Sequence, residues 1–136
     1  MKKIVLVGGC FDILHPGHII FLEKSKQVGD VLVVMLESDE KIKKIKGENR
    51  PIHNQKARAL VLKALKFVDE VILLPNLKSE QEYDRIIKKI KPSIIAVTFG
   101  DPDIHHKKRS AKLVGAKLKF VVRRLKNHAT SSLLDY

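Results

Sequence analysis

The chain has 136 residues, of which 44% are hydrophobic and 31% are charged, and its formal net charge at pH 7 is +12. This length predicts one domain over residues 1–136 that is large enough to bury a core of its own. No apolar run approaches the roughly 20 residues of a membrane-spanning helix. The apolar run after Lys3 is too short for a signal peptide, so we expect a cytoplasmic protein with no membrane partner. Cys10 is the sole cysteine, which excludes an internal disulfide.

The positive charge comes from 27 Lys and Arg residues against 15 Asp and Glu residues. Such an excess permits nucleic-acid binding. However, aromatic residues make up only 5% of the chain and Trp is absent, so rings on which bases could stack are scarce. We therefore expect a basic surface that attracts anionic small molecules, and nucleic acid is the less favoured partner.

Short apolar runs alternate with amphipathic segments along the chain. In chain order the pattern predicts a strand at 4–7, a helix at 19–28, a strand at 31–36, a helix at 54–65, a strand at 70–74, a helix at 79–90, a strand at 93–97, a helix at 107–114, a strand at 118–122 and a short helix at 130–134. Near-continuous apolar strands that alternate with helices indicate a parallel sheet covered on both faces. The expected fold is therefore α/β: a doubly wound, Rossmann-like, five-stranded and mainly parallel sheet with helices on both faces.

Two of these helices carry apolar faces that should turn toward the sheet. In the helix at 54–65 this face is formed by Ala57, Leu60, Val61, Ala64 and Leu65. In the helix at 79–90 it is formed by Tyr83, Ile86, Ile87 and Ile90. Ser79 is the expected N-cap of the second helix, and Gly115 is expected to end the helix at 107–114.

The most informative segment is Gly8-Gly9-Cys10-Phe11-Asp12-Ile13-Leu14-His15-Pro16-Gly17-His18, which joins the first predicted strand to the first predicted helix. A helix N-terminus presents unpaired backbone N–H groups and the positive end of the helix dipole, so it attracts phosphate. Imidazoles at this place can donate hydrogen bonds to an anion as its charge grows. The segment contains neither G-x-G-x-x-G nor G-x-x-x-x-G-K-[ST], so a dinucleotide site and a P-loop are both disfavoured. The location therefore predicts phosphate chemistry of another kind.

The pattern G-x-F-D-x-x-H-x-G-H resembles the signature of the nucleotidyltransferases that share the H-x-G-H motif with class I aminoacyl-tRNA synthetases. Further segments occur in the order seen in the cytidylyltransferase-like family, namely 38–40, 44–47, 50–51, Arg58 and 68–71. Within this family the chain is similar to glycerol-3-phosphate cytidylyltransferase, to the heptose adenylyltransferase domain of bifunctional enzymes and to archaeal FAD synthetase. The resemblance covers nearly the whole chain.

The resemblance implies that His15, His18 and Lys46 are catalytic and stabilise negative charge at the α-phosphorus of a nucleoside triphosphate. It also implies a nucleotide-binding set in the first turn, the basic stretch, the helix at 54–65, the turn after the fourth strand and the C-terminal tail: Gly9, Cys10, Phe11, Gly17, Lys44, Arg58, Gly100, Asp101, His128, Thr130, Ser131 and Ser132. Mg²⁺ is expected to enter with the triphosphate, and no side chains are expected to form a metal site of their own. Asp12 is expected to fix the loop by accepting hydrogen bonds from backbone N–H groups.

The expected reaction transfers a nucleoside monophosphate from ATP or CTP to a phosphorylated acceptor and releases pyrophosphate. Residues 41–51 are closest to the heptose adenylyltransferase pattern, which suggests a sugar phosphate and ATP. Polyol phosphate with CTP, or FMN with ATP, stays open. Lys56 stands where the family has a Glu, and residues 125–128 depart from the Arg-Thr-Glu-Gly of the glycerol-phosphate enzymes. The family also implies a homodimer.

Other interpretations of these residues remain open at this point. The two motif histidines could merely cap or support the helix, Arg58 could be a surface charge, and residues 100–101 could form a plain turn. A metal-dependent hydrolase would use the two motif histidines together with His105 and His106. A basic nucleic-acid-binding domain would carry the H-x-G-H segment as an idle remnant.

Overall fold

The computed structural model describes residues 1–123, which form a five-stranded sheet in which every strand pair is parallel. In chain order the elements are β1 (Ile4–Gly9), α1 (Pro16–Gln27), β2 (Val31–Leu36), α2 (Asp39–Lys46), α3 (Gln55–Lys63), β3 (Glu70–Leu73), α4 (Glu80–Ile90), β4 (Ile94–Phe99), α5 (Ile104–Val114) and β5 (Lys117–Arg123). The strands lie in the order β3-β2-β1-β4-β5. The predicted α/β class and doubly wound sheet are confirmed.

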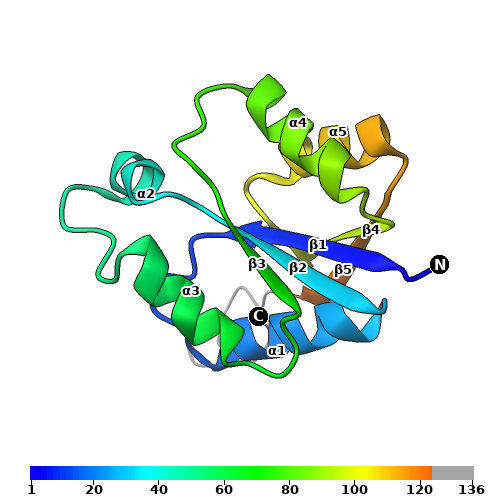
Figure 1. Ribbon diagram of the computed structural model, residues 1–136, viewed down its shortest axis with the longest axis horizontal. Helices are drawn as coiled ribbons and strands as arrows, with labels where there is room; N and C mark the ends of the chain where they lie inside the picture. The colour runs from blue at the N-terminus through cyan, green and yellow to red at the C-terminus, as the bar shows by residue number, and fades with distance from the viewer. Residues whose placement is uncertain (124–136) are drawn as a thin grey trace.

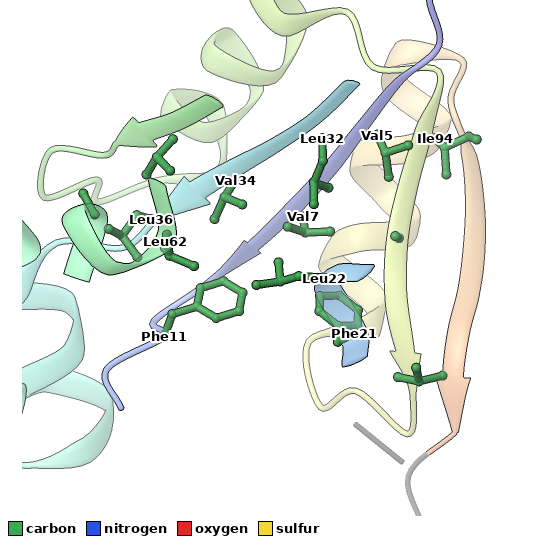
Figure 2. Packing of buried hydrophobic residues seen from close by; sticks show 14 residues of the cluster. Val5, Val7, Phe11, Phe21, Leu22, Leu32, Val34, Leu36, Leu62 and Ile94 are labelled. Atoms are coloured by element: carbon green, nitrogen blue, oxygen red, sulfur yellow. The ribbon is translucent and has the colours of Figure 1, made fainter. Parts of the chain in front are cut away.

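Helices cover both faces of the sheet, with α1 and α3 on one side and α4 and α5 on the other (Figure 1). Successive residues of a strand point to opposite faces. In β1, Val5 and Val7 join the apolar cluster under α1 and α3, whereas Leu6 joins the cluster under α4 and α5. Figure 2 shows the first cluster, in which Phe21 and Leu22 of α1 pack against the strands. Because both faces are buried, the strands are near-continuous apolar runs.

The elements predicted within residues 1–123 are present, and the ends of most of them differ from the predicted ends by a few residues. The short helix predicted at 130–134 lies outside the described residues. The first helix begins at Pro16 rather than at residue 19, because His15 caps it and proline suits the first helical position. Ser79 is the N-cap of α4 and accepts a hydrogen bond from a backbone N–H, as predicted. Gly115 ends α5 in a left-handed conformation with φ of 72°.

The sequence pattern missed α2, which has only two apolar residues. Ile42 is fully buried, whereas Ile45 is 60% exposed, so the helix has almost no apolar face. It is stabilised at its ends instead. The Ser38 hydroxyl accepts a hydrogen bond from the Lys41 N–H, and acidic residues occupy the first turn and lysines the last turn. These capping signals could have predicted the helix.

The predicted inward face of α3 is wrong in part: Leu65, just after the helix, packs on the first cluster, but two of the large apolar residues face solvent. Leu60 is 73% exposed and Val61 is 48% exposed, and the buried positions of this helix are Arg58, Ala59 and Leu62. The apolar pattern failed because it counts arginine as a solvent-facing residue, whereas this guanidinium finds hydrogen-bond acceptors inside the protein. The predicted inward face of α4 is confirmed, since its four residues pack on the second cluster.

The order of the strands reverses between β1 and β4, because β2 and β3 follow on one side of β1 and β4 and β5 on the other. In open α/β sheets, ligands bind outside the carboxyl ends of the strands at this switch point. The H-x-G-H segment follows β1 directly, and Gly100 and Asp101 follow β4. Helix α2 and its connection to α3 project at the same end of the sheet (Figure 1).

Candidate active site

The turn after β1 holds Phe11 in a conformation that few side chains adopt. Its φ of 44° lies in the left-handed region, and its ring is buried. A side chain at Gly9 would place its Cβ 2.9 Å from this ring, so only glycine permits the close approach. The Phe11 ring in turn meets the His18 ring edge-on, with the centroids 5.5 Å apart. The turn therefore helps to fix the position of the second imidazole.

His15 and His18 together cap the N-terminus of α1. The Nδ1 atom of His15 accepts a hydrogen bond from the Gly17 N–H at 3.1 Å, and the Nδ1 atom of His18 accepts one from the His15 N–H at 3.3 Å. A neutral ring whose Nδ1 is an acceptor carries its proton on Nε2. The ring centroids are 3.8 Å apart. The capping interpretation is therefore correct, and capping also determines which nitrogen of each ring is the donor.

Both imidazoles are poorly suited to carrying charge. Burial lowers the pKa of His15 below its ordinary value. For His18, burial together with the neighbouring His15 and Lys46 lowers the pKa to about 4. A neutral imidazole still donates a hydrogen bond to a developing charge, and it does so from a fixed position.

A pocket of about 370 Å³ opens beside these rings, lined by Phe11, Asp12, Ile13, His15, His18, Lys46 and Arg50. Lys46 is the last residue of α2. All three predicted catalytic residues therefore line the same pocket, although their roles in catalysis stay predictions. Lys44, which was predicted to bind nucleotide, is exposed on α2 and is not among the lining residues.

Asp12 ties the connection between α2 and α3 to the first turn. Its Oδ2 accepts hydrogen bonds from Arg50 Nε at 2.6 Å and from the Ile52 N–H at 2.8 Å. Its Oδ1 accepts one from the His53 N–H at 3.0 Å. Burial alone would raise the pKa of Asp12, but the hydrogen bonds outweigh it and lower the pKa to about 2. The expected loop-fixing role is present, and the loop that Asp12 fixes carries one wall of the pocket.

Arg58 is not a surface charge, because its side chain is 0% exposed. Its guanidinium donates to the Cys10 carbonyl at 2.8 Å, to the His53 carbonyl at 3.0 Å and to Asp39 Oδ1 at 2.7 Å. These bonds join the first turn, the start of α2 and the connection that leads into α3. Arg58 thus supports the segments that carry the pocket, and direct contact with nucleotide stays a prediction.

The remaining predicted nucleotide contacts have varied settings. Gly100 has a φ of 93°, and the Asp101 carboxylate accepts a hydrogen bond from the Asp103 N–H and pairs with Lys107, so both residues shape a turn. Burial raises the pKa of the Cys10 thiol, which favours a filling role over a nucleophilic one. The other predicted contacts, His128, Thr130, Ser131 and Ser132, lie outside the described residues.

Residues 1–123 contain no cluster of three or more His, Cys, Asp or Glu side chains that could hold a metal ion. His106 pairs with Glu80 at 2.5 Å across α5 and α4, so the structure does not assemble the four-histidine site of the hydrolase alternative. Mg²⁺ commonly binds through substrate phosphates and few protein ligands. Since both Asp12 oxygens already accept hydrogen bonds, the pocket fits a Mg²⁺ held mainly by the phosphates of a nucleotide. None of the helices described is long and apolar enough to cross a membrane.

Two features of this end of the sheet were not among the predicted site residues. Arg50 lines the pocket beside Lys46. Glu37 directly follows β2, and its two carboxylate oxygens lie 2.9 and 3.0 Å from the hydroxyl of Tyr83, which donates to them. Burial raises the pKa of Glu37. A polar residue directly after a buried strand was the available signal for Glu37, and the Arg-Pro step in the basic stretch was the signal for Arg50.

Comparison with known proteins identifies relatives over most of the chain. A family model described as cytidylyltransferase-like matches residues 6–133. The bifunctional protein HldE of Aliarcobacter butzleri is 48% identical over 100 residues, and that of Campylobacter concisus is 47% identical over 94 residues. The matches cover 74% and 69% of this chain but only 20% and 19% of the relatives. The chain therefore spans about a fifth of the length of these curated relatives.

Solved structures share the fold of this chain. The lipopolysaccharide core biosynthesis protein of Thermoplasma volcanium matches with a TM-score of 0.71 and 31% identity, over 94% of this chain and 100% of that one. The pantoate-beta-alanine ligase of Francisella tularensis matches with a TM-score of 0.61 over 93% of this chain and 60% of that one. At 16% identity, the second match supports the fold alone.

Proposed function

The chain belongs to the cytidylyltransferase-like family of nucleotidyltransferases, and from this premise we propose that it transfers the nucleoside monophosphate of ATP to a sugar phosphate. CTP is the alternative donor. The observation that carries the proposal is the pair of neutral imidazoles at the start of α1, with their Nε2–H donors fixed by capping and Lys46 in the same pocket.

In this reaction an oxygen of the acceptor phosphate attacks the α-phosphorus. The bond from the α-phosphorus to the oxygen that bridges to the β-phosphorus breaks, and pyrophosphate leaves. Such a transfer depends on alignment and charge stabilisation and needs no covalent intermediate.

The residues of the pocket supply these two requirements. His15 and His18 donate hydrogen bonds to phosphate oxygens as negative charge grows, and Lys46 contributes a permanent positive charge. The positive end of the α1 dipole attracts the same anion. Mg²⁺, when it is bound with the triphosphate, offsets part of the phosphate charge.

The choice of a sugar phosphate rests on three likenesses. The sequence of residues 41–51 resembles the heptose adenylyltransferase pattern, and the chain is 48% identical to part of a bifunctional protein HldE. A structural relative is described as a lipopolysaccharide core biosynthesis protein, and lipopolysaccharide is built from sugars. A polyol phosphate with CTP, and FMN with ATP, are the pairs of acceptor and donor against which this choice is tested.

A homodimer is part of the same proposal, and sedimentation equilibrium tests it.

The test begins with the thermal stability of the protein in the presence of Mg²⁺ and ATP, CTP, GTP or UTP. A nucleotide present at about 100 times its Kd should stabilise the fold by about 2.7 kcal/mol, which is enough to rank the four bases. Pyrophosphate release is then measured with heptose 1-phosphate, glycerol 3-phosphate and FMN. We expect ATP and the sugar phosphate to be preferred. Absence of stabilisation by every nucleotide would overturn the proposal.

A further inference from the structure

The two walls of the pocket differ in chemistry. The wall formed by the start of α1 carries His15 and His18, which the structure keeps neutral. Among the described residues that line the pocket, the permanent positive charges are those of Lys46 and Arg50, on the side of α2 and the connection that follows it. Its volume of about 370 Å³ equals that of about a dozen water molecules, so more than one phosphate group can enter.

Arg50 is the more rigidly held of these two cations. Its Nε lies 2.6 Å from Oδ2 of Asp12, whose side chain is 1% exposed, whereas the Arg50 side chain is 33% exposed. The buried carboxylate therefore anchors the inner edge of the guanidinium. The two terminal nitrogens carry the remaining four N–H donors of this planar group, in a geometry that suits a phosphate. The Ile52 N–H shares the same carboxylate oxygen, which fixes the backbone next to Arg50 as well.

The proposed reaction needs a cation at this place. The acceptor phosphate and the triphosphate are both anions, and the acceptor must approach the α-phosphorus on the side opposite the leaving pyrophosphate. A triphosphate held at the start of α1 leaves the opposite wall to the acceptor. The guanidinium of Arg50 keeps its positive charge and is held at the pocket by Asp12, so it can offset the charge of the second anion.

We propose that Arg50, held by Asp12, binds the phosphate group of the acceptor and thereby places its oxygen for attack on the α-phosphorus. This inference rests on the proposed function, because it names the acceptor subsite of the same pocket. Lys46, at the end of α2, lines the same pocket and lies near enough to His18 to lower the pKa of its imidazole. Binding of the acceptor phosphate forms no covalent bond and leaves both reactants intact until transfer.

The test measures two binding constants separately. Isothermal titration calorimetry first gives the Kd of α,β-methylene ATP with Mg²⁺, and then the Kd of inorganic phosphate for the protein saturated with that analogue. The variants are Arg50→Met and Arg50→Lys. Lys43→Met is the matched control, because it removes one positive charge from an exposed position on α2 that does not line the pocket.

We expect Arg50→Met to weaken phosphate binding by about 10- to 100-fold, as expected for the loss of a charge-assisted hydrogen-bonded contact. The Kd of the ATP analogue should change by less than about threefold, and the Lys43→Met protein should match the wild type in both constants. Arg50→Lys should also weaken phosphate binding, because one ammonium group cannot serve Asp12 and a phosphate with the geometry of a guanidinium.

A measurement on the wild-type protein tests the inference even if a variant fails to fold. The ¹⁵Nε–H resonance of Arg50, identified by its disappearance in Arg50→Lys, should shift when inorganic phosphate is added to the analogue complex. An unchanged resonance, or equal phosphate affinity in wild type and Arg50→Met, overturns the inference. So does an Arg50→Met protein that loses the ATP analogue as strongly as phosphate. Failure of the analogue to bind the wild type would instead overturn the proposed function.

Discussion

Replacement of Asp12 by Asn tests the hydrogen bonds by which this buried carboxylate holds one wall of the pocket. The carboxylate accepts three hydrogen bonds, and Asn can accept with only one oxygen. With that oxygen in the Oδ2 position, the amide nitrogen faces the partly buried His53 N–H, which then loses its acceptor at a cost of about 1–3 kcal/mol. The lowered pKa of Asp12 gives a similar value for the stabilising free energy. The difference between 3.8 and about 2 corresponds to about 2 kcal/mol at about 1.36 kcal/mol per pKa unit. We expect Asp12→Asn to lower the free energy of unfolding by about 2–3 kcal/mol at neutral pH.

Urea unfolding followed by circular dichroism measures this difference, since the chain has no Trp for fluorescence. The matched control is Asp30→Asn, an exposed residue that accepts one N–H bond, which Asn can also accept, so its effect should stay within about 0.5 kcal/mol. The pKa of Asp12 is lowered in the folded state, so the unfolded chain takes up the proton first as pH falls. The stabilisation is full above pH 3.8 and is lost as pH falls through about 2. Equal free energies of unfolding for wild type and Asp12→Asn at neutral pH would contradict this role of Asp12. So would a difference between the two free energies that does not become smaller as the pH falls toward 2.

Three further predictions concern the first turn and the imidazoles. His18→Ala should lower the rate of pyrophosphate release by about 10²–10³-fold, while His106→Ala, at an exposed position, should leave it unchanged; equal rates in the two variants would contradict the assignment. The pKa of His18 is lowered from 6.5 to about 4 because the folded protein favours the neutral ring. The stabilisation of the fold by this neutral ring is therefore full above pH 6.5 and is lost as the pH falls toward 4. Stability measured across this window should therefore fall more steeply in wild type than in His18→Gln, and parallel curves would argue against a buried neutral ring. Gly9→Ala should lower both Tm and activity, because its Cβ would lie 2.9 Å from the Phe11 ring, whereas Gly8→Ala has 3.8 Å to its nearest neighbours and should be tolerated in a thermal melt and rate assay.

Apolar runs predicted the layers of the fold because each strand is buried on both faces. The strand at 31–36 matches β2 at both ends, since its six apolar residues stop abruptly at Glu37. The same rule failed for α2, which is stabilised by capping and charge rather than by an apolar face. It also failed for α3, where a buried arginine occupies a core position.

The site was predictable where one local segment carries it. The H-x-G-H segment contains its own turn, glycine and helix start, so His15 and His18 could be named from sequence. Arg58 depends on acceptors contributed by three separate segments, and Arg50 depends on a carboxylate 38 positions away. Such long-range partners leave no periodic signal in the sequence, and only the assembled fold reveals them.

A crystal structure of the protein with Mg²⁺ and α,β-methylene ATP tests whether the two imidazoles bind the triphosphate. We predict that the Nε2 atoms of His15 and His18 lie within about 3.2 Å of phosphate oxygens at the start of α1. A nucleotide bound at another place, with both rings out of hydrogen-bond reach of its phosphates, would contradict the account.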